Sequence, residues 1–155
     1  MPEFSETVVR INRVATVVKG GRRFSFSALV VVGNRRGRLG CGFGKANEVP
    51  DAVEKAVQDA RKHMIDVPVL DGTIPHTVWG EYGASKVILK PAPPGTGVIA
   101  GAAVRAVVVA AGVRNVFTKS IRSSNALNLV KAAMDGLTKL KTVEQVEKLR
   151  GVKLR

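Results

Sequence analysis

Glycine-containing turns between runs of β-branched residues are the feature that most limits the fold of the first third of the chain. Residues 7–18 form one such run, the pair Gly20-Gly21 follows it, and residues 24–32 form a second run. Glycine pairs supply the positive φ that hairpin turns require, and β-branched runs favour strands. A polar turn at 34–37 then precedes a glycine-interleaved run at 38–45. The pattern predicts three consecutive strands joined by two tight turns.

One helix is predicted after these strands. Pro50 suits the first turn of a helix, and acidic Asp51 lies near its positive end. The predicted buried face comprises Val53, Ala56, Val57, Ala60 and Met64. The helix should end before Val67-Pro68, because a residue that precedes proline avoids helical angles.

A new series of strand-like runs begins near Gly72. We therefore expect an N-terminal domain at 1–70 and a C-terminal domain at 71–155 with a short tail. The predicted elements of the second domain are strands at 73–82 and 85–90, a loop at 91–97, a buried apolar helix at 98–111 capped by Gly112, a strand at 115–121, a helix capped by Ser124 or Asn125, and a short helix between Thr142 and Gly151. The fold class is therefore α+β: a β-β-β-α domain followed by an α/β domain.

The charge is strongly basic and unevenly distributed. The chain carries 25 Lys and Arg against 12 Asp and Glu, a net charge of +13. Residues 7–47 and 82–134 contain no acidic side chain. Protein surfaces usually mix both signs, so acid-free stretches indicate a polyanionic partner. The densest charge lies at the predicted turns, around Arg22-Arg23 and Arg35-Arg36, which favours nucleic acid over a membrane surface. Phe24 and Phe26 share one strand face, and we expect both in the core.

The motifs of enzymes and metal sites are incomplete. Gly40–Lys45 lacks the residues that a phosphate-binding Walker loop requires. The Gly95-Thr96-Gly97 loop is not followed by the acid of a dinucleotide site. Cys41 has no neighbouring base, and His63 and His76 lie far apart. We therefore expect no catalytic residues, no metal and no cofactor. A lone cysteine, and a start without a signal-peptide pattern, favour a cytoplasmic protein.

Several motifs together resemble the bacterial small-subunit (30S) ribosomal protein uS5 family. The first half carries KGGRRFSF at 19–26 and GFGKA at 42–46. The second half carries GTIPH at 72–76, LKPA at 89–92, GTGVIAG at 95–101 and DGL at 135–137. The chain departs from the family pattern at Val109, Arg122 and Ala126.

The resemblance implies an N-terminal domain like a double-stranded-RNA-binding domain and a C-terminal domain like uS5 domain 2 and the GHMP kinases. It implies a structural, non-enzymatic protein of the cytoplasmic small ribosomal subunit that binds 16S rRNA, contacts uS4 and uS8, lies near the mRNA path and supports decoding accuracy, without a membrane or a homo-oligomer. The candidate rRNA-binding residues are Arg13, Lys19, Gly20, Gly21, Arg22, Arg23, Arg35, Arg36, Arg38, Lys45, Lys119 and Arg122. A helix starting near Gly97, with Gly101 and Arg105, should face a protein partner.

Two alternatives remain open at this point. One is a free-standing RNA-binding chaperone, and the other is a small kinase-like phosphotransferase that uses the loop at 95–97.

Overall fold

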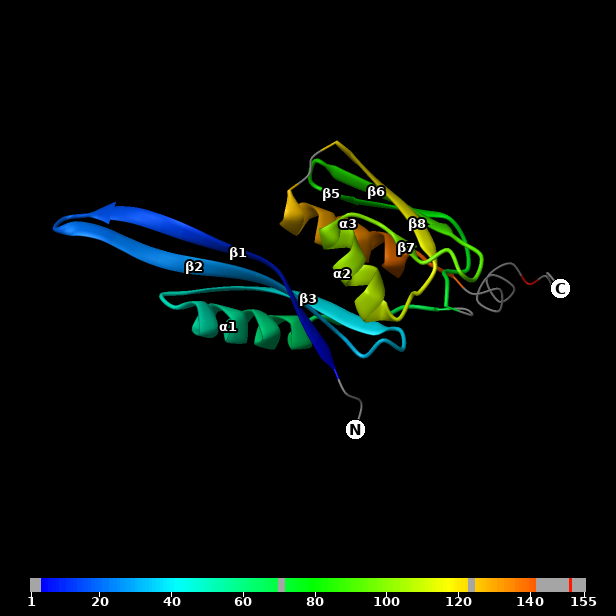
Figure 1. Cartoon of the computed structure of the whole chain (residues 1–155), viewed down its shortest axis with the longest axis horizontal. Helices are drawn as coiled ribbons and strands as arrows, with labels where there is room; N and C mark the ends of the chain where they lie inside the picture. The colour runs from blue at the N-terminus through cyan, green and yellow to red at the C-terminus, as the bar shows by residue number, and fades with distance from the viewer. Residues whose placement is uncertain (1–3, 70–71, 123–124, 142–150, 152–155) are drawn as a thin grey trace.

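The computed structural model describes residues 4–69, 72–122, 125–141 and 151, and it contains two four-stranded sheets (Figure 1). The first sheet has the order β1-β2-β3-β4, comprising β1 (Ser5–Val18), β2 (Gly21–Gly33), β3 (Arg38–Ala46) and β4 (Met64–Asp66). Helix α1 (Val49–Lys62) lies between β3 and β4 in the chain. The predicted β-β-β-α order is confirmed, but β4 was not predicted.

The second sheet has the order β5-β6-β8-β7, with β7 parallel to β8 and the other pairs antiparallel. Its strands are β5 (Val78–Tyr82), β6 (Ser85–Pro91), β7 (Val98–Ile99) and β8 (Val116–Arg122), and its helices are α2 (Ala102–Ala111) and α3 (Ala126–Thr138). The prediction of one helix over 98–111 was wrong at its start, because residues 98 and 99 form β7. The helix predicted after Thr142 lies outside the described residues.

The helix ends follow local sequence signals. Gly112 adopts a left-handed conformation at the end of α2, with φ of 93°. Its amide donates to the carbonyl oxygens of Val108 and Val109. At the start of α3, the side chain of Asn125 accepts a hydrogen bond from the amide of Asn128. Both predicted caps are confirmed, because glycine at C-caps and asparagine at N-caps act through adjacent backbone groups.

Helix α1 packs against glycines of β3 rather than through large side chains. Its buried residues are Ala52, Ala56 and Ala60. A Cβ added at Gly42 or Gly44 would overlap the backbone of this helix. The predicted face of the helix was therefore only partly right: Val53 and Val57 are half-buried at its margin, and Met64 belongs to β4.

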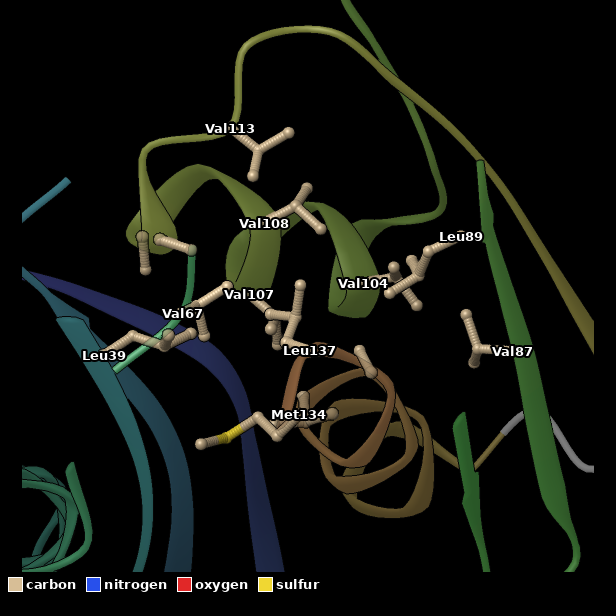
Figure 2. Packing of buried hydrophobic residues seen from close by; sticks show 14 of the residues in the cluster. Leu39, Val67, Val87, Leu89, Val104, Val107, Val108, Val113, Met134 and Leu137 are labelled. Atoms are coloured by element: carbon tan, nitrogen blue, oxygen red, sulfur yellow. The ribbon is translucent and has the colours of Figure 1, made fainter. Parts of the chain in front are cut away.

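The main hydrophobic core lies between the two sheets. Figure 2 shows α2 and α3 side chains placed between Leu39 of the first sheet and Val87 and Leu89 of the second. The helical contributors include Val104, Val107, Val108, Met134 and Leu137. Because the same cluster contains residues of both sheets, burial of apolar surface holds the two halves together. Among the described helices, none is long and apolar enough to cross a membrane.

Candidate nucleic-acid interface

The hairpin of β1 and β2 extends beyond the rest of the first sheet (Figure 1). The pairing of β2 with β3 ends at Phe26 opposite Ala46, so residues 21–25 of β2 have only β1 as a neighbour. Gly20 and Gly21 have φ of 107° and 144°, as the predicted tight turn requires. Lys19 and Arg23 are exposed at this tip.

Arg13 is held against an exposed aromatic ring. The centre of its guanidinium lies 3.8 Å from the centroid of Phe24. Phe24 is 41% exposed, so the expectation that it belongs to the core was wrong. Phe24 pairs with Ala15 of β1. It has no partner in β3, because the pairing of β2 with β3 ends at Phe26. Phe26 is half-buried against the α1 cluster, because it still has a partner in β3.

Cationic side chains lie on both faces of the hairpin. Arg13 pairs with Phe26 and lies on one face, whereas Arg23 lies on the opposite face. Lys45 of β3 pairs with Ser27 and lies on the same face of the sheet as Arg23. Arg10, which we did not include among the candidates, lies on that face too, because it pairs with Leu29 in the same register and alternates with Arg13 along β1. A two-stranded ribbon with cations on both faces can contact two separate phosphate chains.

The second basic turn is docked against α2. The side chain of Asn34 accepts hydrogen bonds from the amides of Arg36 and Arg38, at 2.8 and 3.0 Å. The amides of Arg35 and Gly37 donate to carbonyl oxygens of Ala110 and Ala111, at 3.0 and 2.8 Å. The turn therefore satisfies carbonyl groups at the C-terminal end of α2. The side chains of Arg35, Arg36 and Arg38 remain exposed.

The candidate residues do not form one continuous site. The two turns lie at opposite ends of β2, which has 13 residues and so spans about 40 Å. Lys119 is exposed on β8 of the second sheet. The side chains of Arg22 and Arg122 lie outside the described part of the chain. Arg38 lies 4.0 Å from Asp66 in an exposed ion pair, a geometry that contributes little to stability.

The candidate partner surface surrounds the start of α2. Gly97 has φ of 79°, and its amide donates to the side chain of Asn115 at 3.0 Å. Gly101 is the N-cap, and Arg105 donates to the carbonyl oxygen of Ala100 at 3.3 Å. The helix begins at Ala102, so the prediction that it begins near Gly97 was wrong. A groove of about 580 Å³ is lined by Gly101 and Arg105 and reaches Lys119.

Cys41 has an environment that opposes nucleophilic chemistry. Burial raises the pKa of the Cys41 thiol, while the positive charge of Lys131 lowers it to a smaller extent. The protonated thiol is a poor nucleophile. Within the described residues, no three His, Cys, Asp or Glu side chains are grouped as metal ligands would be.

Comparison with known proteins gives matches over most of the chain. The family model described as ribosomal protein S5, N-terminal domain, matches residues 4–68, and the model of the S5 C-terminal domain matches residues 80–150. A protein of Syntrophobacter fumaroxidans named small ribosomal subunit protein uS5 is 58% identical over 146 residues, which are 94% of this chain and 88% of that protein. A protein of the same name from Rhodopirellula baltica is 56% identical over 147 residues, 95% of this chain and 83% of the relative.

Proposed function

Because this chain belongs to the ribosomal protein S5 family, we propose that its protruding basic hairpin binds 16S rRNA by neutralising backbone phosphates. The family resemblance inferred from the sequence is confirmed. The chain is accordingly a structural, non-enzymatic protein of the small ribosomal subunit in the cytoplasm.

The observation that supports this proposal is the exposure of unneutralised cations on the hairpin. Residues 7–47 contain no acidic side chain, and Arg13, Lys19 and Arg23 are exposed. Among the ion pairs of the described residues, only the one between Arg38 and Asp66 uses a candidate RNA-binding side chain. Cations without local partners can neutralise backbone phosphates, and this neutralisation releases the counterions that are condensed on the nucleic acid.

The hairpin geometry favours contact with the RNA backbone over readout of bases. Its glycine turn at Gly20-Gly21 leaves open space, since an added Cβ would meet nothing within 4 Å at either position. RNA main chain can therefore approach the protein main chain at the tip. Phe24 orients the guanidinium of Arg13 through a cation–π contact, and a positioned guanidinium loses less entropy when it grips a phosphate.

The finer assignments extend the same proposal. We place a domain boundary at 70–71, which is supported by the gap between β4 and β5 and by the limits of the two family matches. Gly97, Gly101 and Arg105 are proposed to face uS4, and the chain is proposed to contact uS8 and to lie near the path of mRNA, where it supports decoding accuracy. These assignments rest on the family resemblance.

Binding to a 16S rRNA transcript tests the central proposal. The purified chain is titrated with the transcript over a range of salt concentrations, beside the variant Arg13→Ala/Arg23→Ala. The slope of log affinity against log salt should fall by about 2, roughly one for each lost phosphate contact. Lys62→Ala is the matched control, because Lys62 is exposed on α1 outside the acid-free stretches. Equal slopes for the double variant and the wild type would contradict the proposal.

Sedimentation separates ribosomal assembly from an independent RNA chaperone. We expect the tagged chain to remain with small subunits through a high-salt wash, and Arg13→Ala/Arg23→Ala to reduce its incorporation. A chain found free of subunits in a gentle lysate would favour the chaperone.

A further inference from the structure

The outer face of the second sheet carries exposed aromatic side chains. On β5, a Cβ added at Gly80 would meet the backbone of α3, so Gly80 faces that helix. Its neighbours Trp79 and Glu81 therefore point to the opposite face. Trp79 is 41% exposed, and Phe117 of β8 is 40% exposed. The helices α2 and α3 belong to the core on the inner face, and among the described residues the outer face keeps its two rings exposed.

Strand pairing arranges the outer face in three rows. One row contains Trp79, Ile88 and Lys119; the next contains Glu81, Lys86 and Ile121; the third contains Lys90, Phe117 and Ile99. Every row thus combines a lysine with at least one apolar side chain.

The cations occupy the middle of this face rather than its rim. Lys86 and Lys119 lie on β6 and β8, which are the two inner strands of the sheet. The buried centre of a protein–protein interface is depleted in lysine. Sites for single-stranded nucleic acid instead combine rings that stack on bases with cations that bind phosphates. The distribution of charge therefore favours nucleic acid.

The spacing of ring and cation supports the same partner. The ammonium of Lys86 lies 4.6 Å from the centroid of the Trp79 ring. Lys119 lies in the same row of paired residues as Trp79, so a base stacked at this ring would bring its phosphate close to a lysine. Glu81 is the one acidic residue of the four strands. Its carboxylate lies 3.3 Å from Lys86, which leaves Lys90 and Lys119 to carry the positive potential of the face.

We propose that the outer face of β5, β6, β8 and β7 binds an unpaired RNA strand, with bases stacked on Trp79 and Phe117 and phosphates held by Lys90 and Lys119. This inference rests on the proposed RNA-binding function and adds a second mode to it. The hairpin contacts the phosphates of structured RNA, whereas this sheet holds single-stranded RNA by its bases.

Trp79 is the only tryptophan of the chain, so its fluorescence reports directly on this face. Oligouridylate, which has little structure of its own, is titrated into the full chain, and a blunt RNA duplex is titrated separately. We expect oligouridylate to quench Trp79. Labelled oligouridylate then measures affinity: Phe117→Leu should weaken binding about five-fold or more, the effect of one lost stacked base, while Phe117→Tyr retains a ring and should bind like the wild type.

Charge variants provide the matched comparison. Lys119→Glu should weaken binding of oligouridylate strongly, whereas Lys62→Glu changes the net charge equally and should have a small effect. Binding of the duplex should respond to Arg13→Ala/Arg23→Ala and not to Phe117→Leu.

The two proposals fail in distinguishable ways. Duplex binding without quenching of Trp79 by oligouridylate overturns the single-strand site and leaves the hairpin proposal intact. Failure of both RNAs to bind overturns both. Equal affinities of Phe117→Leu and Phe117→Tyr exclude stacking. If Phe117→Leu binds RNA normally but no longer joins the small subunit, the face is a protein-docking surface and the inference is wrong.

Discussion

The backbone amide of Arg35 donates a 3.0 Å hydrogen bond to the carbonyl oxygen of Ala110, and this contact joins the turn after β2 to the end of α2. Gly112 lies directly beside it, since an added Cβ there would overlap the carbonyl group of Arg35. A turn that carries exposed arginines is therefore also the joint between the two halves of the molecule. Hydrogen bonds to α2 hold the backbone of this turn in place, so the positions from which its arginine side chains extend are fixed.

The close contact between Gly112 and Arg35 predicts that a side chain at position 112 lowers the stability of the fold. Gly112→Ala should destabilise the chain by more than the roughly 1–2 kcal/mol that a left-handed residue with a Cβ costs, because its Cβ also displaces the Arg35 carbonyl. Gly95→Ala is the matched control: Gly95 has φ of 91° and nothing within 4 Å of an added Cβ. Urea unfolding of both variants measures the difference. Equal losses in the free energy of unfolding for the two variants would show that the turn after β2 accommodates a side chain at position 112.

The contact of α1 with β3 predicts that Gly42 is intolerant of any side chain. Gly42→Ala should lower the free energy of unfolding by about 1–3 kcal/mol or more, since its Cβ overlaps the backbone of Ala56 and Ala60. Gly101→Ala, where an added Cβ meets nothing within 4 Å, should cost less, about 0.5 kcal/mol, because alanine is a poorer N-cap than glycine. Thermal melts of the two variants test this. A Gly42→Ala variant as stable as Gly101→Ala would contradict the close packing.

The contact of Arg13 with Phe24 should be measurable as a coupling. A double-mutant cycle with Arg13→Ala, Phe24→Ala and the double variant should give about 0.5–1 kcal/mol in urea unfolding, as expected for an exposed cation–π pair. Phe24→Ala alone should be mild, because Phe24 lies outside both core clusters. A loss above about 3 kcal/mol, typical of a core phenylalanine, would refute the exposed position.

The raised pKa of Cys41 predicts how stability depends on alkaline pH. The unfolded chain loses the thiol proton at about pH 8.5, before the folded chain does, so the unfolded state binds fewer protons at higher pH. Stability contributed by the neutral thiol is present at lower pH and should decrease as pH rises through that range. Cys41→Ala should remove this part of the slope in urea unfolding from pH 7.5 to 10. Identical slopes would show that Cys41 does not contribute.

Much of the fold was predictable because its signals are local. The turn at Gly20 needs positive φ, the end of α2 needs a left-handed residue at Gly112, and the start of α3 needs a side-chain acceptor at Asn125. Each requirement involves only a few adjacent backbone groups. By contrast, β4 and β7 contain three and two residues, too few for any periodic pattern to appear.

The candidate site was predictable in composition but not in arrangement. The acid-free stretches identified the exposed hairpin cations. They gave no information on Phe24, which is exposed because β3 ends two residues short of it, or on the rings of the second sheet. Trp79 and Phe117 lie in segments 38 residues apart in sequence, and only strand pairing places them on one face.

The order of amino acids alone determined the family, the sequence of major strands and helices, and the sign of the partner's charge, because propensity, capping and net charge are properties of neighbouring residues. Only the tertiary structure decided which apolar residues stay in water and which face of α1 is buried. Those outcomes depend on what covers each surface. The glycines of β3 let the alanine face of α1 pack closely against the sheet. Helices α2 and α3 cover one side of the second sheet, while its aromatic side remains exposed.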